Sequence, residues 1–165
     1  MNRFLLSIWF LAISLNAFSY NALEEVRTKF PHFNSETEVD TYLQLLANDS
    51  SDLSTIYKGA LYLFKSKFSI LPTTKFKHFK KGKSLIDQAC ANSNSLEIRA
   101  IRLIFQYQLP RFLGYFNNRE SDFDYLVKHF HTSNLMPSRK EKLLQMLLQL
   151  ETLEFQKRLI LKQLS

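Results

Sequence analysis

Residues Asn94 to Pro110, NSLEIRAIRLIFQYQLP, decide the fold of this chain. Their pattern predicts a helix: Asn94 can cap its start, Glu97 can complete a capping box, and Pro110 ends it near Gln108. At 100° per residue its apolar side chains cover most of the circumference: Leu96, Ile98, Ala100, Ile101, Leu103, Ile104, Phe105 and Tyr107. A helix that is apolar on nearly every side must be surrounded by other helices.

The rest of the chain also predicts helices joined by short links. Apolar residues at helical spacing indicate helices over about 21–29, 36–47, 52–68, 73–91, 118–131 and 138–163. The last begins with Ser138-Arg139-Lys140-Glu141, which fits a capping box. No segment alternates as a strand does. The sequence therefore predicts an all-α fold of about seven helices in stacked antiparallel pairs.

Two glycines point to pairing of the kind found in tetratricopeptide repeats (TPR). Gly59-Ala60-Leu61-Tyr62 fits the G-x2-Y part of the first helix of a repeat, and Gly82 with Ile86 resembles part of its second helix. The Trp and Leu positions of the motif hold Thr55 and Lys58 in this chain. We expect a TPR-like α-α superhelix in which Gly82 lets a neighbouring helix come close.

The N-terminus fits a secretory signal peptide. Arg3 precedes an uncharged run from Phe4 to Leu15, and Ala17-Phe18-Ser19 fits a cleavage site. We expect a signal peptide over residues 1–19 and a single helical domain over 20–165, secreted or periplasmic; retention of the signal as an anchor is the alternative. The formal net charge of +7 becomes +6 when Arg3 is removed.

Composition excludes several function classes. The chain has only three glycines, too few for phosphate-binding loops, dinucleotide fingerprints or nucleophile elbows. Its single cysteine, Cys90, cannot form an intrachain disulfide and lies on an apolar stripe, so we expect a buried, inert thiol. No HExxH motif, Cys/His ligand pair or calcium loop is present, so no metal, cofactor or catalytic residue is predicted.

One polar cluster remains a candidate site, and its members are Glu97, Arg99, Arg102, Asp122 and Asp124. If Arg102 is buried by the helices that surround its own apolar helix, it needs a carboxylate partner, because an unpaired buried charge is very costly. We expect that partner to be Asp122 or Asp124. The functional alternative is a site for an anionic ligand, or the centre of a small envelope enzyme.

A basic surface is the second candidate. It consists of five lysines with no acidic residue among them: Lys75, Lys77, Lys80, Lys81 and Lys83. Lys77, Lys80 and Lys81 point away from the apolar side of the helix predicted over 73–91. They form either an ordinary solvated face or a surface that attracts anionic membrane components. No nucleic-acid-binding motif is present, so nucleic acid is not an expected partner.

Several stretches together resemble a group of small secreted proteins from Bacteroidota. They are 57–60 (YKGA), 81–82 (KG), 96–102 (LEIRAIR), 110–115 (PRFLGY) and Asp122. The resemblance implies an all-helical, TPR-like fold in a bacterial envelope, and it carries over no catalytic residue. We therefore expect a protein that acts through contacts with another envelope protein. A small enzyme and a lipid-surface or ligand-binding module are the alternatives.

Overall fold

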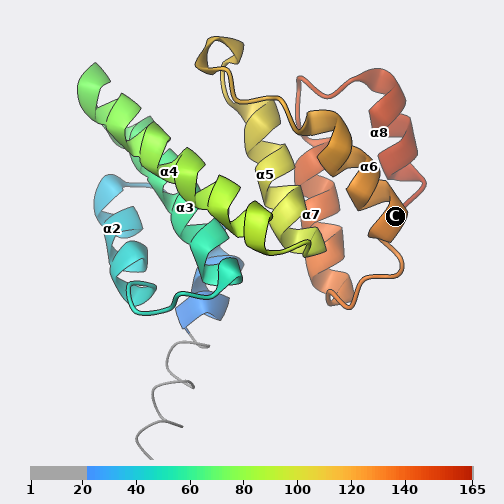
Figure 1. Ribbon diagram of the computed structural model, residues 1–165, viewed down its shortest axis with the longest axis horizontal. Helices are drawn as coiled ribbons and strands as arrows, with labels where there is room; N and C mark the ends of the chain where they lie inside the picture. Colours follow the sequence, from blue (N-terminus) through green and yellow to red (C-terminus); the bar gives the residue numbers. More distant parts are fainter. Residues whose placement is uncertain (1–21, 165) are drawn as a thin grey trace, which may run out of the picture. The chain divides into compact units, whose positions relative to one another are not determined.

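The computed structural model describes residues 22–164, and all regular secondary structure in that range is helical (Figure 1). The all-α prediction is confirmed. After a helical segment at 22–29 the elements are α2 (Glu36–Leu45), α3 (Asp52–Phe68), α4 (Pro72–Asn92), α5 (Leu96–Gln108), a 3-10 turn η1 (Arg111–Leu113), α6 (Arg119–His129), α7 (Pro137–Leu148) and α8 (Phe155–Lys162). The predicted signal peptide, 1–19, lies outside the described residues.

The described residues form two compact units within the predicted domain of residues 20–165. The first ends at Ile86 and the second begins at Asp87, so the boundary falls inside α4. None of the helices between residues 22 and 164 has both the length and the apolar character that crossing a membrane requires.

In the first unit α2 packs against α3, and α3 pairs with α4 through two glycines. A Cβ on Gly82 would lie 2.8 Å from the carbonyl oxygen of Gly59, and one on Gly59 would lie 2.9 Å from that of Gly82. Farther along, the Ser66 hydroxyl donates to the Lys75 carbonyl over 2.9 Å. The contact positions run in opposite directions along the two helices, so the pair is antiparallel. The expected close approach at Gly82 is confirmed.

In the second unit α5 packs against α6 and α7, and α7 packs against α8. All eight apolar residues of α5 named above are buried, as the sequence predicts. The polar stripe of α5 consists of Arg99, Arg102 and Gln106, and the last two are buried as well. Every side of α5 therefore carries part of the interior of this unit.

The N-terminal caps of α2 and α5 differ. The Ser35 hydroxyl accepts from the Glu38 amide over 3.1 Å, as a cap should, but the Glu38 carboxylate accepts from the amide of Asn34. The capping box at Asn94 is wrong: Ser95 is the N-cap residue of α5, without a side-chain cap bond. Asn94 instead accepts a hydrogen bond from Arg99.

The single helix predicted over 138–163 is also wrong at its start and in its middle. It begins one residue earlier because Pro137 occupies the first turn, where its missing N–H costs nothing. It stops at Leu148, and a separate helix starts at Phe155. The Arg158 guanidinium bonds the carbonyls of Leu148 and Leu150, so tertiary hydrogen bonds replace the helical ones in the break.

Candidate functional site

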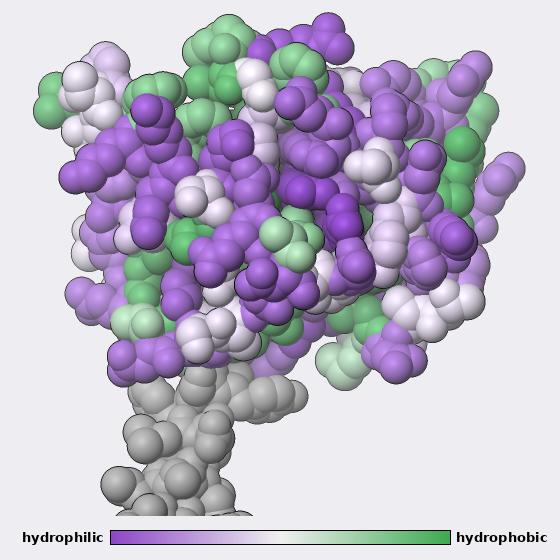
Figure 2. Space-filling model, viewed as in Figure 1, coloured by the Kyte–Doolittle hydropathy of each residue, from purple (hydrophilic) through white to green (hydrophobic). Residues whose placement is uncertain are grey.

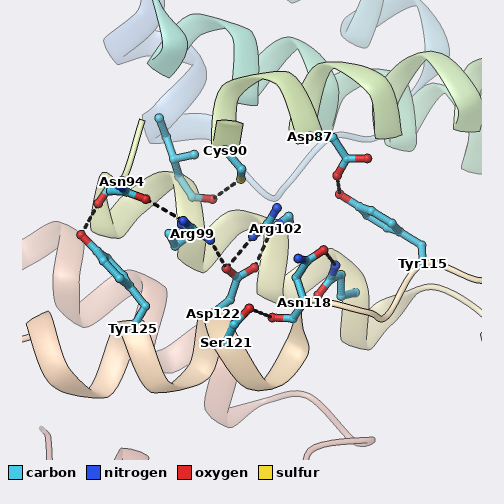
Figure 3. Close-up of polar contacts among 12 residues, drawn as sticks. Asp87, Cys90, Asn94, Arg99, Arg102, Tyr115, Asn118, Ser121, Asp122 and Tyr125 are labelled. Carbon is cyan, nitrogen blue, oxygen red and sulfur yellow. Dashed lines mark hydrogen bonds and ion pairs between the residues drawn. The ribbon is translucent and has the colours of Figure 1, made fainter. Parts of the chain in front are cut away.

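The polar stripe of α5 faces α6, and its centre is a pair formed by Arg102 and Asp122 (Figure 3). Arg102 Nε donates to Asp122 Oδ2 over 2.6 Å, and Arg102 Nη2 donates to Asp122 Oδ1 over 2.7 Å. The guanidinium thus binds the carboxylate in a bidentate way, which fixes its orientation as well as its distance. Of the two carboxylates expected as partners, the structure selects Asp122.

Arg99 binds the same carboxylate from one helical turn earlier. Its Nη1 donates to Asp122 Oδ1 over 2.9 Å, and its Nη2 donates to Asn94 Oδ1 over 2.6 Å. The guanidinium carbon also lies 5.4 Å from the centre of the Tyr125 ring, and the Tyr125 hydroxyl donates to the carbonyl of Asn94. Figure 3 shows these groups converging at the start of α5.

The same stripe continues at the other end of α5. Gln106 Nε2 donates to Asn118 Oδ1 over 3.4 Å, and Arg119 donates to the Gln106 carbonyl. Later residues of α5 therefore contact earlier residues at the start of α6, so the two helices are antiparallel. We call the bonds of Arg99, Arg102 and Gln106 with Asn118 and Asp122 the α5–α6 ladder.

Burial decides what the ladder can do chemically. Asp122 is 0% exposed and Arg102 is 6% exposed, and both oxygens of the carboxylate accept from arginine. Burial would lower the pKa of Arg102, but its hydrogen bonds with Asp122 and its electrostatic interactions with Asp122, Cys90 and Tyr115 together outweigh that effect and raise the pKa above its ordinary value. A carboxylate that is enclosed and doubly bonded is poorly placed to accept a proton from a substrate.

Two residues expected in this cluster lie elsewhere. Asp124 is exposed on α6, because two residues along a helix turn the side chain to another face. Glu97 is buried, and its charge acts on Lys142 of α7. There it partly offsets the lowering of the Lys142 pKa that burial and Arg139 cause. Within residues 22–164, Asp122 is the carboxylate that bonds Arg99 and Arg102.

Cys90 lies close to the ladder and is chemically quiet. The side chain is buried, its sulfur lies 3.9 Å from the Ile98 carbonyl, and burial raises the pKa of the thiol to about 11. The expected inert thiol fits this environment, because nucleophilic cysteines have lowered pKa values. Nearby, the buried Tyr115 hydroxyl donates to Asp87 over 2.9 Å.

Sequence reasoning missed a second polar group, centred on Tyr107. The Tyr107 hydroxyl donates to Glu154 over 2.7 Å and accepts from Lys157 over 3.2 Å, and Lys157 also bonds Glu120. The apolar pattern of α5 places Tyr107 in the core, and its partners lie 47 and 50 residues away in the chain. No local pattern indicates so distant a contact.

The predicted lysine face is exposed at Lys75, Lys77, Lys80 and Lys81, whereas Lys83 is partly buried. Lys65, which belongs to the same basic stretch, points to α2 and pairs with Asp40 over 2.5 Å. The ammonium of Lys80 lies 4.7 Å from the centre of the Phe76 ring. Phe76 itself is half-exposed, and the turn before α4 also exposes Ile70 and Leu71.

The exposure of Ile70 and Leu71 could have been predicted from the sequence, because they stand outside both flanking helical stripes and directly before Pro72.

Across residues 22–164, no group of three or more His, Cys, Asp and Glu side chains is placed to hold a metal ion. Comparison of the chain with protein-family models, curated proteins and solved structures found no match.

Proposed function

We propose that this chain is a secreted or periplasmic helical protein that acts by binding another protein of the cell envelope. The observation that carries the proposal is the outer face of α8. Phe155 is 74% exposed, and Leu159 and Ile160 are also exposed on the same short helix. Phe155 and Leu159 are four residues apart and so share one face. Large apolar side chains grouped on a surface mark sites of interaction.

The charges of α8 favour a protein over a lipid as the partner. Lys157 pairs with Glu120, and Arg158 donates to the carbonyls of Leu148 and Leu150. These two cations therefore bind groups of the chain itself, and Lys162 at the end of α8 is the remaining cation of the helix. An apolar face with a single lysine at one end is better suited to an apolar protein surface than to anionic headgroups.

The antiparallel pairing of α3 with α4 and of α5 with α6 supports a TPR-like scaffold, as does the resemblance to secreted helical proteins. Proteins built from such pairs offer surfaces for other proteins. The α5–α6 ladder supports binding over catalysis, because Arg102 and Asp122 are engaged with each other. An envelope location rests on the pattern of residues 1–19.

The test is capture of partners from a detergent-solubilised envelope by chemical cross-linking. The parent chain is compared with a Phe155→Ser, Leu159→Ser variant and with a control, Gln156→Ser, Gln163→Ser, which changes exposed polar residues of the same segment. The apolar variant should lose the captured protein at least tenfold, and the control should keep it. Equal melting of the three chains shows that folding is not the cause. Capture that is equal for all three, or absent for the parent, contradicts the proposal.

A further inference from the structure

The turn between α3 and α4 holds two aliphatic side chains out in solvent. Ile70 is 91% exposed and Leu71 is 64% exposed. Ser69 ends α3 by donating its amide and its hydroxyl to the Lys65 carbonyl, over 3.0 and 2.8 Å, and Pro72 starts α4 immediately after the pair. The turn is short and bonded at its first residue, so Ile70 and Leu71 are fixed at the end of the helical hairpin.

Positive charge surrounds this pair. No Asp or Glu occurs between Asp52 and Asp87, a stretch that includes all of α3 after its first residue and most of α4. Lys67, Lys75 and Lys77 are exposed, and in the described part of the chain none of the three forms an ion pair. We call residues 67–77 the α3–α4 tip. In Figure 2 hydrophobic atoms at the upper left, where Figure 1 places this turn, stand beside hydrophilic ones.

We infer that the α3–α4 tip docks end-on onto an anionic phospholipid surface, with Ile70 and Leu71 entering the interface between headgroups and acyl chains. The tip is a protruding end, and a protein partner needs a matching cavity to cover it. A bilayer deforms around a protrusion and offers apolar depth and negative charge together. This site is separate from the α8 face and does not depend on the proposed protein contact.

The distance of each lysine from Leu71 determines how strongly it should contribute to membrane binding. An α-helix rises 1.5 Å per residue, so Lys75 and Lys77 lie about 6 and 9 Å along α4 from Leu71, and Lys81 lies about 15 Å away. Electrostatic attraction fades over a Debye length of about 8 Å at physiological salt. Lys75 and Lys77 should therefore contribute strongly, and Lys81 weakly. Phe76 lies between the two nearer lysines in the sequence, and phenylalanine is typical of the apolar face that membrane-surface helices bury.

A tryptophan reporter tests the depth of docking in the full chain. Trp9 is the only tryptophan, so Trp9→Phe gives a background into which Leu71→Trp or, as a control, Phe155→Trp introduces one emitter. With vesicles of phosphatidylglycerol and phosphatidylcholine, the emission of the Leu71→Trp variant should shift to the blue and be quenched by brominated acyl chains. The Phe155→Trp variant should show neither effect. Equal quenching of the two variants, or none of the Leu71→Trp variant, overturns the inference.

Co-sedimentation with the same vesicles tests the charge. Lys75→Gln with Lys77→Gln should weaken binding about 30-fold, since each lysine near an anionic surface contributes about 1 kcal/mol, or about fivefold. Lys81→Gln should change binding less than twofold, and Ile70→Ser with Leu71→Ser should weaken it at least tenfold. Equal binding to pure phosphatidylcholine, equal loss with Lys81→Gln, or binding to polyglutamate but not to vesicles, would overturn the inference.

Discussion

Two helix pairs of this protein are held in register by opposite means. Where α3 meets α4, the side chains of Gly59 and Gly82 are absent, and the two backbones come into direct contact. Where α5 meets α6, two arginines bond one buried aspartate. Adding a methyl group at Gly59 or Gly82 would disrupt the α3–α4 contact, whereas removing a charged group would disrupt the α5–α6 contact. A helix pair can thus be specified either by shape or by charge, and the two kinds fail under different substitutions.

The largest expected effect is at the charged contact. Asp122→Ala leaves the enclosed Arg102 without its carboxylate and should lower the free energy of unfolding by about 4 kcal/mol. Urea unfolding measures the change. The control is Asp124→Ala on the exposed side of α6, which should cost less than about 0.5 kcal/mol. Equal losses for the two variants would mean that the ladder does not specify the pair.

Arg102→Ala should cost slightly less, about 3 kcal/mol, because Asp122 keeps one hydrogen bond from Arg99. Arg102→Lys keeps the charge but loses the bidentate geometry, so it should fall between the alanine variant and the parent. The same urea titration tests both. If Arg102→Ala unfolds at the same urea concentration as the parent, the bidentate bond makes no net contribution.

The glycine contact should respond to the addition of one methyl group. Gly82→Ala places a Cβ against the Gly59 carbonyl and the Leu63 side chain, and we expect a loss of about 2 kcal/mol from overpacking. Alanine is otherwise the better helix former by about 1 kcal/mol. Lys81→Ala, at the preceding exposed position, should be neutral or slightly stabilising, because Lys and Ala have similar helix propensities. A Gly82→Ala variant more stable than the parent would refute specification by shape.

The smallest expected effect is on the reactivity of Cys90 rather than on folding. Cys90 is the only cysteine of the chain and lies close to Arg102 and Asp122, so its labelling rate reports on the surroundings of that pair. With a pKa of about 11 against an ordinary 9.0, the thiolate population at pH 8 should be about a hundredfold lower than that of a free thiol. Labelling with an aromatic disulfide should be correspondingly slow, and fast in urea. A native rate equal to the unfolded rate would contradict burial of the thiol.

The same raised pKa gives a pH dependence with a definite sign. Between pH 9 and 11 the unfolded chain loses the Cys90 proton while the native chain keeps it, so stability falls as pH rises through this range. A Cys90→Ala variant should show a shallower fall than the parent over the same pH range. Identical slopes would mean that Cys90 ionises equally in both states.

The sequence predicted the interior better than the ends of the helices. The apolar stripes correctly predicted the bounds of α3, 52–68. They also predicted that α5 and Arg102 are buried, because burial follows the periodicity of apolar residues directly. The N-caps of α5 and α7 and the break before α8 were missed. The break contains tertiary contacts such as that of Arg158 with the Leu150 carbonyl, which the local apolar pattern does not indicate.

The candidate site was predicted in part for the same reason. Arg99, Arg102 and Asp122 come together because helical spacing places both arginines on one stripe and charge requires a partner. Glu97 and Asp124 were included by nearness in the sequence, yet each lies two residues from a ladder member and so faces another way. The exposed pair Ile70 and Leu71 lies between two helical stripes, where periodicity alone does not indicate which side chains are buried.

The α5–α6 ladder also has a consequence for recognising distant relatives. Because bonds between the helices fix their register, the connector from 109 to 117 is free to change in length. An insertion there moves neither helix along the other, whereas a single deletion between Asn118 and Asp122 turns one of them about 100° away from α5. A chain that shares this pair should therefore keep R-x2-R-x3-Q in one helix and N-x3-D at the start of the next, at variable separation, even where overall identity has faded.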